Sequence, residues 1–279
     1  MKLRFKFSFI DITRLAGFCL FGISIASIPI FSFNPKLYLL TWIIVGLMLV
    51  DMSLFIVLNK KIRVDIVICS LALFSFSAFI SSALNGFHGF NFTPILLPIA
   101  TSIIYMFSKA TSASKTMLLS AFFGMCVFLV AFIIHYRSDI VSMNFNERFG
   151  RDFGDENDIA ILLGFGFTYA FYKTLDSKKT LIIIPLSILF ILFAFCGLLT
   201  GSKIFVLILF FGTTISVFIR LGKKKWWISL LIVCGIVVLG VVLLTIPAFA
   251  VVKSRFDMFF RIFFSDSSSS SRADYSSIF

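Results

Sequence analysis

The sequence has few charged residues, and acidic ones are especially scarce. Only 14% of its 279 residues are Asp, Glu, Lys or Arg, whereas 59% are hydrophobic. A soluble domain usually carries about a quarter charged residues. The shortage argues against a soluble globular protein and predicts a chain that is embedded in a membrane.

Several chemical signatures are also missing. The five cysteines lie inside apolar runs without a CxxC pair, so no disulfide or redox motif is indicated. The two histidines, His88 and His135, are far apart, and no metal-ligand spacing is present. Alternating strands of about ten residues, typical of outer-membrane barrels, are absent, and no run resembles a cleavable signal peptide. We therefore expect neither a cofactor nor a barrel.

What the sequence does have is a series of long apolar runs. A hydrocarbon core of about 30 Å requires about 20 apolar residues per helix. We expect an all-α, polytopic transmembrane bundle of about nine spans, at residues 15–33, 38–58, 64–84, 91–107, 116–136, 158–172, 181–199, 202–219 and 226–250. The sixth run is short, so we expect it to extend into its flanks.

Basic residues predict the orientation and the division of the chain. Most of the 25 Lys and Arg residues cluster on one side of the expected spans, which is typical of the cytoplasmic side. The N-terminus is then cytoplasmic. Residues 1–136 form a bundle of five spans, 137–157 an external loop, 158–250 a bundle of four spans, and 251–279 an external tail. The net charge of +12 reflects this topology and gives no support to nucleic-acid binding.

The external loop carries the most distinctive polar residues. Arg148, Arg151, Gly154 and Asn157 recur every three positions just before the sixth span. In a helix, neighbours in this series would lie side by side, and two guanidinium groups could bind a phosphate. A structural explanation is also open, because nearby acids could pair with the arginines and Asn157 could cap a helix. The residues alone favour this structural explanation.

Two further places could bind an anion on the same side. The turn at 200–203 (Thr-Gly-Ser-Lys) offers a glycine, a hydroxyl and the cation of Lys203 at a helix start, which suits a phosphate. The plainer explanation is a lysine that extends to the interface. In the tail, Arg272 follows a run of serines, although such a residue is most often only an anchor at the lipid headgroups.

Within the membrane, one acidic residue stands out. Asp51 precedes Asn59 by eight residues, which places it about 12 Å from the cytoplasmic end of its helix. An acid at that depth is costly and is a functional candidate by default. A pair with Arg14 or Arg63 would explain it equally well, so both explanations remain open.

Three segments together resemble the O-antigen polymerase and O-antigen ligase superfamily over roughly residues 137–279: RFGRDFGDEND, LLTGSK and SRF…SSSSSR. Members of that superfamily carry an Arg…Gly…Asn element before a span and a TGSR-like turn two spans later. By this resemblance, Arg148 or Arg151 matches the loop arginine, Gly154 and Asn157 match the glycine and asparagine, and Arg272 matches the arginine after the serine-rich stretch. Lys203 stands in place of the turn arginine, which keeps the charge but loses the bidentate fork.

The resemblance implies a multi-pass glycosyltransferase of the bacterial inner membrane that acts in lipopolysaccharide or capsular polysaccharide biosynthesis. Its substrate would be a polyprenyl-diphosphate-linked oligosaccharide at a periplasmic site, without nucleotide sugar or metal, and its catalytic base is unassigned. Its partners would be membrane lipids, a flippase and a chain-length regulator. Family members continue through a large periplasmic loop and further spans, so we expect a truncated form, whose activity is in question. The alternatives are a ligase, a lipid-glycan flippase or other membrane transporter, and a noncatalytic scaffold.

Overall fold

Helices are the only regular elements in the part of the chain that the structure describes. The computed structural model describes residues 9–32, 35–59, 65–84, 93–142, 149–221 and 235. Six of its helices are long and apolar enough to cross a membrane: Phe9–Phe31, Leu39–Leu58, Ile66–Leu84, Ser114–His135, Thr180–Leu199 and Lys203–Arg220. The described part of the chain is all-helical, and the length and composition of these helices indicate a multi-pass membrane protein.

The remaining expected spans differ from these six. Helix α4 (Thr93–Thr111) contains a shorter apolar segment, Leu96–Thr111. Helix α7 (Glu156–Asp176) extends past both ends of the sixth apolar run, as predicted, and carries charged residues in its first and last turns. The ninth run, 226–250, lies outside the described residues except for Gly235.

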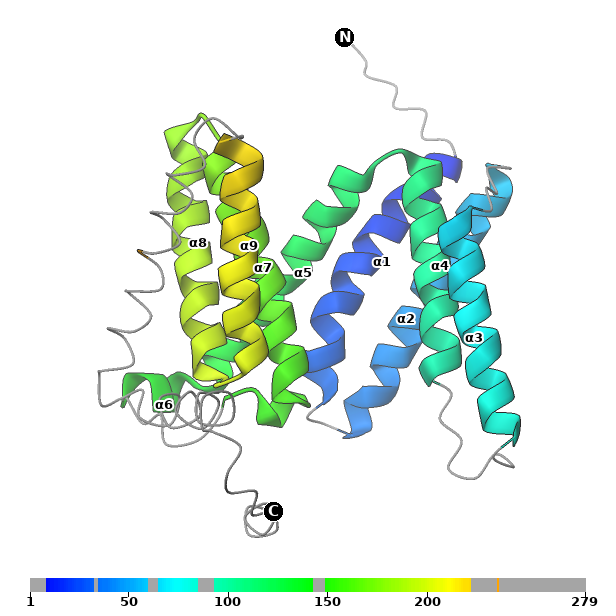
Figure 1. The fold of residues 1–279 in the computed structure, drawn as a ribbon, viewed down its shortest axis with the longest axis horizontal. Helices are drawn as coiled ribbons and strands as arrows, with labels where there is room; N and C mark the ends of the chain where they lie inside the picture. Colours follow the sequence, from blue (N-terminus) through cyan, green and yellow to red (C-terminus); the bar gives the residue numbers. More distant parts are fainter. Residues whose placement is uncertain are drawn as a thin grey trace, which may run out of the picture. The chain divides into compact units, whose positions relative to one another are not determined.

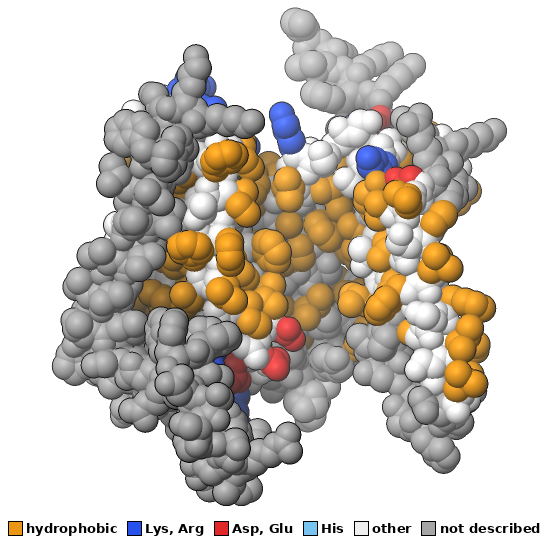
Figure 2. Space-filling model, in the orientation of Figure 1, with side chains coloured by type: hydrophobic (Ala, Val, Ile, Leu, Met, Phe, Trp, Pro, Cys, Tyr) orange, Lys and Arg blue, Asp and Glu red, His pale blue; other side chains and the backbone are white. Residues whose placement is uncertain are grey.

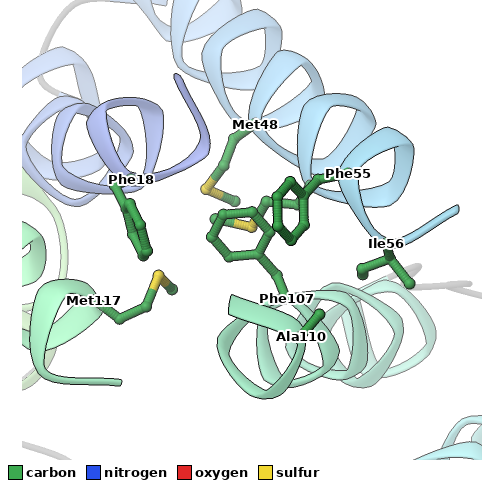
Figure 3. Close-up of a cluster of buried hydrophobic side chains, with 8 residues drawn as sticks. Phe18, Met48, Phe55, Ile56, Phe107, Ala110 and Met117 are labelled. Atoms are coloured by element: carbon green, nitrogen blue, oxygen red, sulfur yellow. The ribbon is translucent and has the colours of Figure 1, made fainter. Parts of the chain in front are cut away.

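The first of two compact units spans Met1–Ala131. It contains α1 (Phe9–Ser32), α2 (Pro35–Leu58), α3 (Ile66–Leu84), α4 and most of α5 (Ser114–His135). Helix α1 packs against α2, and α4 packs against both α2 and α3 (Figure 1). At the centre of its core, the Phe107 ring packs edge to face with the rings of Phe18 and Phe55, and the ring centroids lie 5.3 and 5.1 Å apart (Figure 3).

Helices α1 and α5 approach each other through glycine. A side chain at Gly124 of α5 would overlap the backbone carbonyl oxygen of Gly22 in α1. In the same contact, the Ser120 hydroxyl donates a hydrogen bond to the carbonyl oxygen of Phe18. Small residues permit this approach. Van der Waals packing then stabilises the helix pair, because the hydrophobic effect does not drive helices together within lipid.

We expect Gly124→Ala to lower the midpoint of thermal unfolding in detergent. The added methyl group meets backbone, which cannot rotate away, and overpacking of this kind typically costs about 1–3 kcal/mol. Gly46→Ala in α2 is the matched control, because a Cβ there has nothing within 4 Å. Equal midpoints for the two variants would contradict the close contact between α1 and α5.

The second unit spans Phe132–Phe279, and three long helices make up most of its described part. Helix α7 packs against both α8 (Thr180–Leu199) and α9 (Lys203–Leu221). Here too glycines permit close contact: a Cβ at Gly164 would lie 2.7 Å from Cγ2 of Ile208, and one at Gly166 would overlap the ring of Phe193. The short helices α6 (Arg137–Val141) and η1 (Arg151–Phe153) lie at the end of this bundle where α8 turns into α9 (Figure 1).

The sides of the helices are apolar in both units. Figure 2 shows hydrophobic side chains along them, with charged side chains gathered near helix ends. Ile66 of α3 is 81% exposed and Leu181 of α8 is 87% exposed. Apolar surface of this extent is unfavourable in water, and lipid chains would cover it.

Candidate functional site

Two hydrogen bonds connect the turn between α8 and α9 to the chain around the start of α7: one to the loop before this helix and one to its first turn. The backbone N–H of Phe149 donates to the carbonyl oxygen of Leu199 at 3.2 Å. The hydroxyl of Ser202 donates to Oδ1 of Asn157 at 2.8 Å, across 45 residues of sequence. The two places that the sequence offers as separate anion sites therefore lie together at one end of the second unit.

The turn itself is tight, as predicted, and it is also largely buried. Helix α8 ends at Leu199, α9 begins at Lys203, and Gly201 adopts a left-handed φ of 62°. Thr200 is fully buried, and its hydroxyl donates to the carbonyl oxygen of Gly197 at 2.7 Å. The protons of both turn hydroxyls are thus engaged by the protein, and so are the backbone N–H groups of Thr200, Gly201 and Ser202.

The loop is not the continuous helix that would place its polar residues on one face. Gly150 and Gly154 have φ values of 103° and 123°, which glycine adopts at little cost and which interrupt a helix on either side of η1. The three-residue period is therefore wrong as a guide to this segment. The predicted cap is also wrong: Asp155 caps α7 by accepting from the N–H of Asn157 at 2.7 Å.

A cluster of polar and aromatic side chains holds the loop from the other side. Nε2 of His135 lies 3.0 Å from Oδ2 of Asp152, and the hydroxyl of Tyr136 donates to the same oxygen at 3.0 Å. That hydroxyl also accepts from the N–H of Gly150 at 2.9 Å, and the Tyr136 ring stacks on Phe149. Sequence reasoning missed this cluster, because nothing local links His135 to an acid 17 residues away.

The surroundings of the cluster change the acidity of two of its members. The hydrogen bond with His135, and then that from Tyr136, lower the pKa of Asp152 below its ordinary value of 3.8. Burial raises the pKa of Tyr136 to about 12. The tyrosine therefore keeps its proton at any physiological pH and remains a donor to an ionised Asp152.

We expect the loop to loosen only in strong acid. A lowered carboxyl pKa stabilises the folded loop fully above pH 3.8, and this stabilisation is lost as the pH falls through the lowered pKa. Hydrogen-exchange protection of residues 149–154, corrected for intrinsic rates, should therefore fall in that window. Asp152→Asn should show less protection and no such fall. Constant protection of the native loop through strong acid would contradict the role of Asp152.

The predicted site residues differ in exposure, and two of them lie outside the described part of the chain. Arg151 and Gly154 are exposed, whereas Asn157 and Lys203 are half-buried. Arg148 and Arg272 lie outside the described residues. The structure thus brings the cations of Arg151 and Lys203 to the same end of the second unit, where α7 and α9 also begin. Within the described ranges, no group of three His, Cys, Asp or Glu residues could hold a metal ion.

Electrostatics at this end favour an anion near α9 more than near α7. Both helices point their N-terminal N–H groups at it, and such ends attract negative charge. At α7 the carboxylates of Asp155, Glu156 and Asp158 already offset the positive potential of the helix end. At α9 the first turn contains no acid and begins with Lys203. The turn is therefore the more electropositive part.

In the first unit, Asp51 of α2 does not pair with Arg14. Arg14 bonds Asp11, with NH2 and Oδ1 3.3 Å apart, and Arg63 lies outside the described residues. Oδ2 of Asp51 is buried and has no hydrogen-bond partner among the residues described. The pair with Arg14 is thus wrong, whereas the pair with Arg63 stays a prediction beside the functional explanation.

The chain matches no protein-family model, no curated protein and no solved structure. Its resemblance to the O-antigen polymerase and ligase superfamily therefore rests on the three quoted segments alone.

Proposed function

We propose that the chain is a bacterial inner-membrane glycosyltransferase that polymerises lipid-diphosphate-linked O-antigen or capsule repeat units on the periplasmic face. One observation carries the proposal: the hydrogen bond from Ser202 to Asn157, 2.8 Å long. It joins two of the segments on which the resemblance rests, which are far apart in the sequence. The packing of α7 against α8 and α9 brings these two segments to the same place.

The chemistry requires positive charge at this place. An acceptor hydroxyl attacks the anomeric carbon of the donor glycan, and the bond from that carbon to the diphosphate oxygen breaks. The lipid diphosphate leaves with the electron pair, and the hydroxyl proton passes to a base that is not assigned. Cations held in position stabilise the charge that develops on the diphosphate. Arg151 and Lys203 supply them in this proposal, together with Arg148 and Arg272.

The proposal includes nine spans, a cytoplasmic N-terminus and an external site. The distribution of basic residues supports it, because the opposite end of the α7–α9 bundle carries Lys173, Lys178, Lys179 and Arg220. Ser138 is an exposed residue of α6. A Ser138→Cys variant should react with an impermeant thiol reagent added from the periplasmic side. Reaction only after the inner membrane is opened would overturn the orientation.

The activity can be tested with the purified full-length protein in liposomes. Given a polyprenyl-diphosphate-linked oligosaccharide, with EDTA and no nucleotide sugar, it should produce longer lipid-linked glycans and release one lipid diphosphate per new linkage. Elongation only onto a lipid A core would indicate a ligase. Failure to form any linkage would refute the glycosyltransferase. A flippase and a chain-length regulator are the proposed partners in the cell.

A lipid-glycan flippase or other transporter is the second candidate, and the buried carboxyl of Asp51 favours it. Intramembrane acids often mark a substrate or ion pathway. Such a protein should change the accessibility of cysteines placed near Asp51 when substrate is added. Accessibility that stays constant, together with polymerisation in the liposome assay, would exclude this candidate.

A further inference from the structure

The polar atom that most needs an explanation is Oδ2 of Asp51. In the part of the chain that the structure describes, it is the one buried side-chain nitrogen or oxygen without a hydrogen-bond partner. Asp51 as a whole is half-buried, but an ionised carboxylate with one oxygen enclosed and unpaired is still costly, because that oxygen has lost its hydration without gaining a hydrogen bond.

The surroundings of this oxygen are apolar and specifically shaped. It faces α1 at Gly17, where an added Cβ would lie 3.1 Å from Oδ2 of Asp51 and 2.7 Å from Cζ of Phe107. Glycine thus leaves just enough room for the carboxyl between α1 and α4. Phe107 is fully buried and held between two other phenylalanine rings (Figure 3), so it is poorly placed to move aside.

The charged groups on the neighbouring helices are engaged elsewhere. On α1, Arg14 bonds Asp11. At α4, the hydroxyl of Tyr105 donates to Oδ2 of Asp65 at 2.7 Å, and Nζ of Lys109 lies 5.4 Å from the centroid of the Tyr105 ring. These contacts leave none of the described cations of α1 or α4 to neutralise a negative charge on Asp51.

We propose that Asp51 is a proton-binding site within the membrane, whose carboxyl carries an exchangeable proton at neutral pH. The neutral form suits the packed arrangement of α1, α2 and α4. The ionised form needs water at Oδ2 as well, and water reaches this oxygen when α1 moves away from α2 at Gly17. Protonation is in this way coupled to the packing of the first unit. The inference is independent of the glycosyltransferase, whose proposed site lies in the second unit.

A lipid-soluble carbodiimide, dicyclohexylcarbodiimide, tests this directly on the full-length protein. It reacts with a protonated carboxyl: the acid proton moves to a carbodiimide nitrogen, and the carboxyl oxygen bonds to the central carbon. Rearrangement then gives a stable N-acylurea that contains the whole reagent, and mass spectrometry of peptides locates it. We expect Asp51 to be modified at neutral pH. Above the titration midpoint, modification should fall about tenfold per pH unit, because the protonated fraction does so.

Asp65 is the internal control, because it lies at a helix end and its carboxylate accepts hydrogen bonds from the Tyr105 hydroxyl and from the backbone N–H groups of Val67 and Ile68. It should be modified much less than Asp51 at neutral pH in the same sample, and Asp65→Asn should leave the modification of Asp51 unchanged. Asp51→Asn should abolish the signal, but the mapping on the native chain does not depend on that variant being folded. Equal modification of both acids, modification of Asp51 only in acid, or no modification at any pH would each overturn the proposal. Polymer formation is measured separately, so failure here leaves the proposed function standing.

Discussion

Replacement of Arg151 by alanine is expected to slow polymer formation by about a hundredfold or more. Loss of one donor that stabilises developing charge typically costs about 3 kcal/mol in the transition state. Arg151 is exposed in η1, between two glycines that fix the loop, and lies at the same end of the second unit as Lys203. The measurement is the initial rate of glycan elongation by the full-length protein in liposomes, with the midpoint of thermal unfolding as a check on folding.

Arg137→Ala provides the matched control for this prediction. Arg137 is also an exposed arginine of the second unit, but it lies in α6 and outside the motif. We expect this variant to keep its rate. Arg151→Lys should fall between the two, because lysine keeps the charge and loses the two-pronged contact. Identical rates for Arg151→Ala and Arg137→Ala would remove Arg151 from the site.

The helices were predictable from the sequence because the hydrocarbon core sets a length that a run of apolar residues either reaches or does not. Six described helices satisfy this criterion, and α7 extends beyond its apolar run as expected. The period of three in the loop was misleading for a local reason: Gly150 and Gly154 adopt φ values that interrupt a helix. A spacing rule holds only where the backbone is regular.

The contacts that form the candidate site could not be predicted in the same way. The turn at 200–203 was recognisable from its glycine, yet its bond to Asn157 depends on how α7 packs against α8 and α9. The cluster of His135, Tyr136 and Asp152 depends on where the loop folds back after η1. These are tertiary contacts between segments whose local patterns say nothing about each other. The resemblance named Asn157 and the turn at 200–203 separately, and the structure shows the hydrogen bond between Asn157 and Ser202.

Asn157→Ala is expected to have the second largest effect, on both stability and activity. Ser202 is 3% exposed, and its hydroxyl donates to Asn157 Oδ1. Without that acceptor, the buried Ser202 hydroxyl loses this hydrogen bond, which lowers the free energy of unfolding by about 1–3 kcal/mol. The contact between the first turn of α7 and the turn at 200–203 would then loosen, and with it the placement of Arg151 relative to Lys203. Thermal unfolding and elongation rate should fall together. Ser202→Ala should destabilise less, because half-buried Asn157 can find water, and the double variant should be no worse than Asn157→Ala.

Asn157→Asp separates the structural role of this residue from its proposed role in binding. Aspartate keeps an acceptor for Ser202 and places a negative charge in the first turn of α7, where acids stabilise a helix. Stability should therefore be preserved or increased. A diphosphate at the same place would be repelled, so elongation should be slow in a well-folded protein. An Asn157→Asp variant that elongates glycans as fast as the native chain would show that the site holds the fold together but binds no anion there.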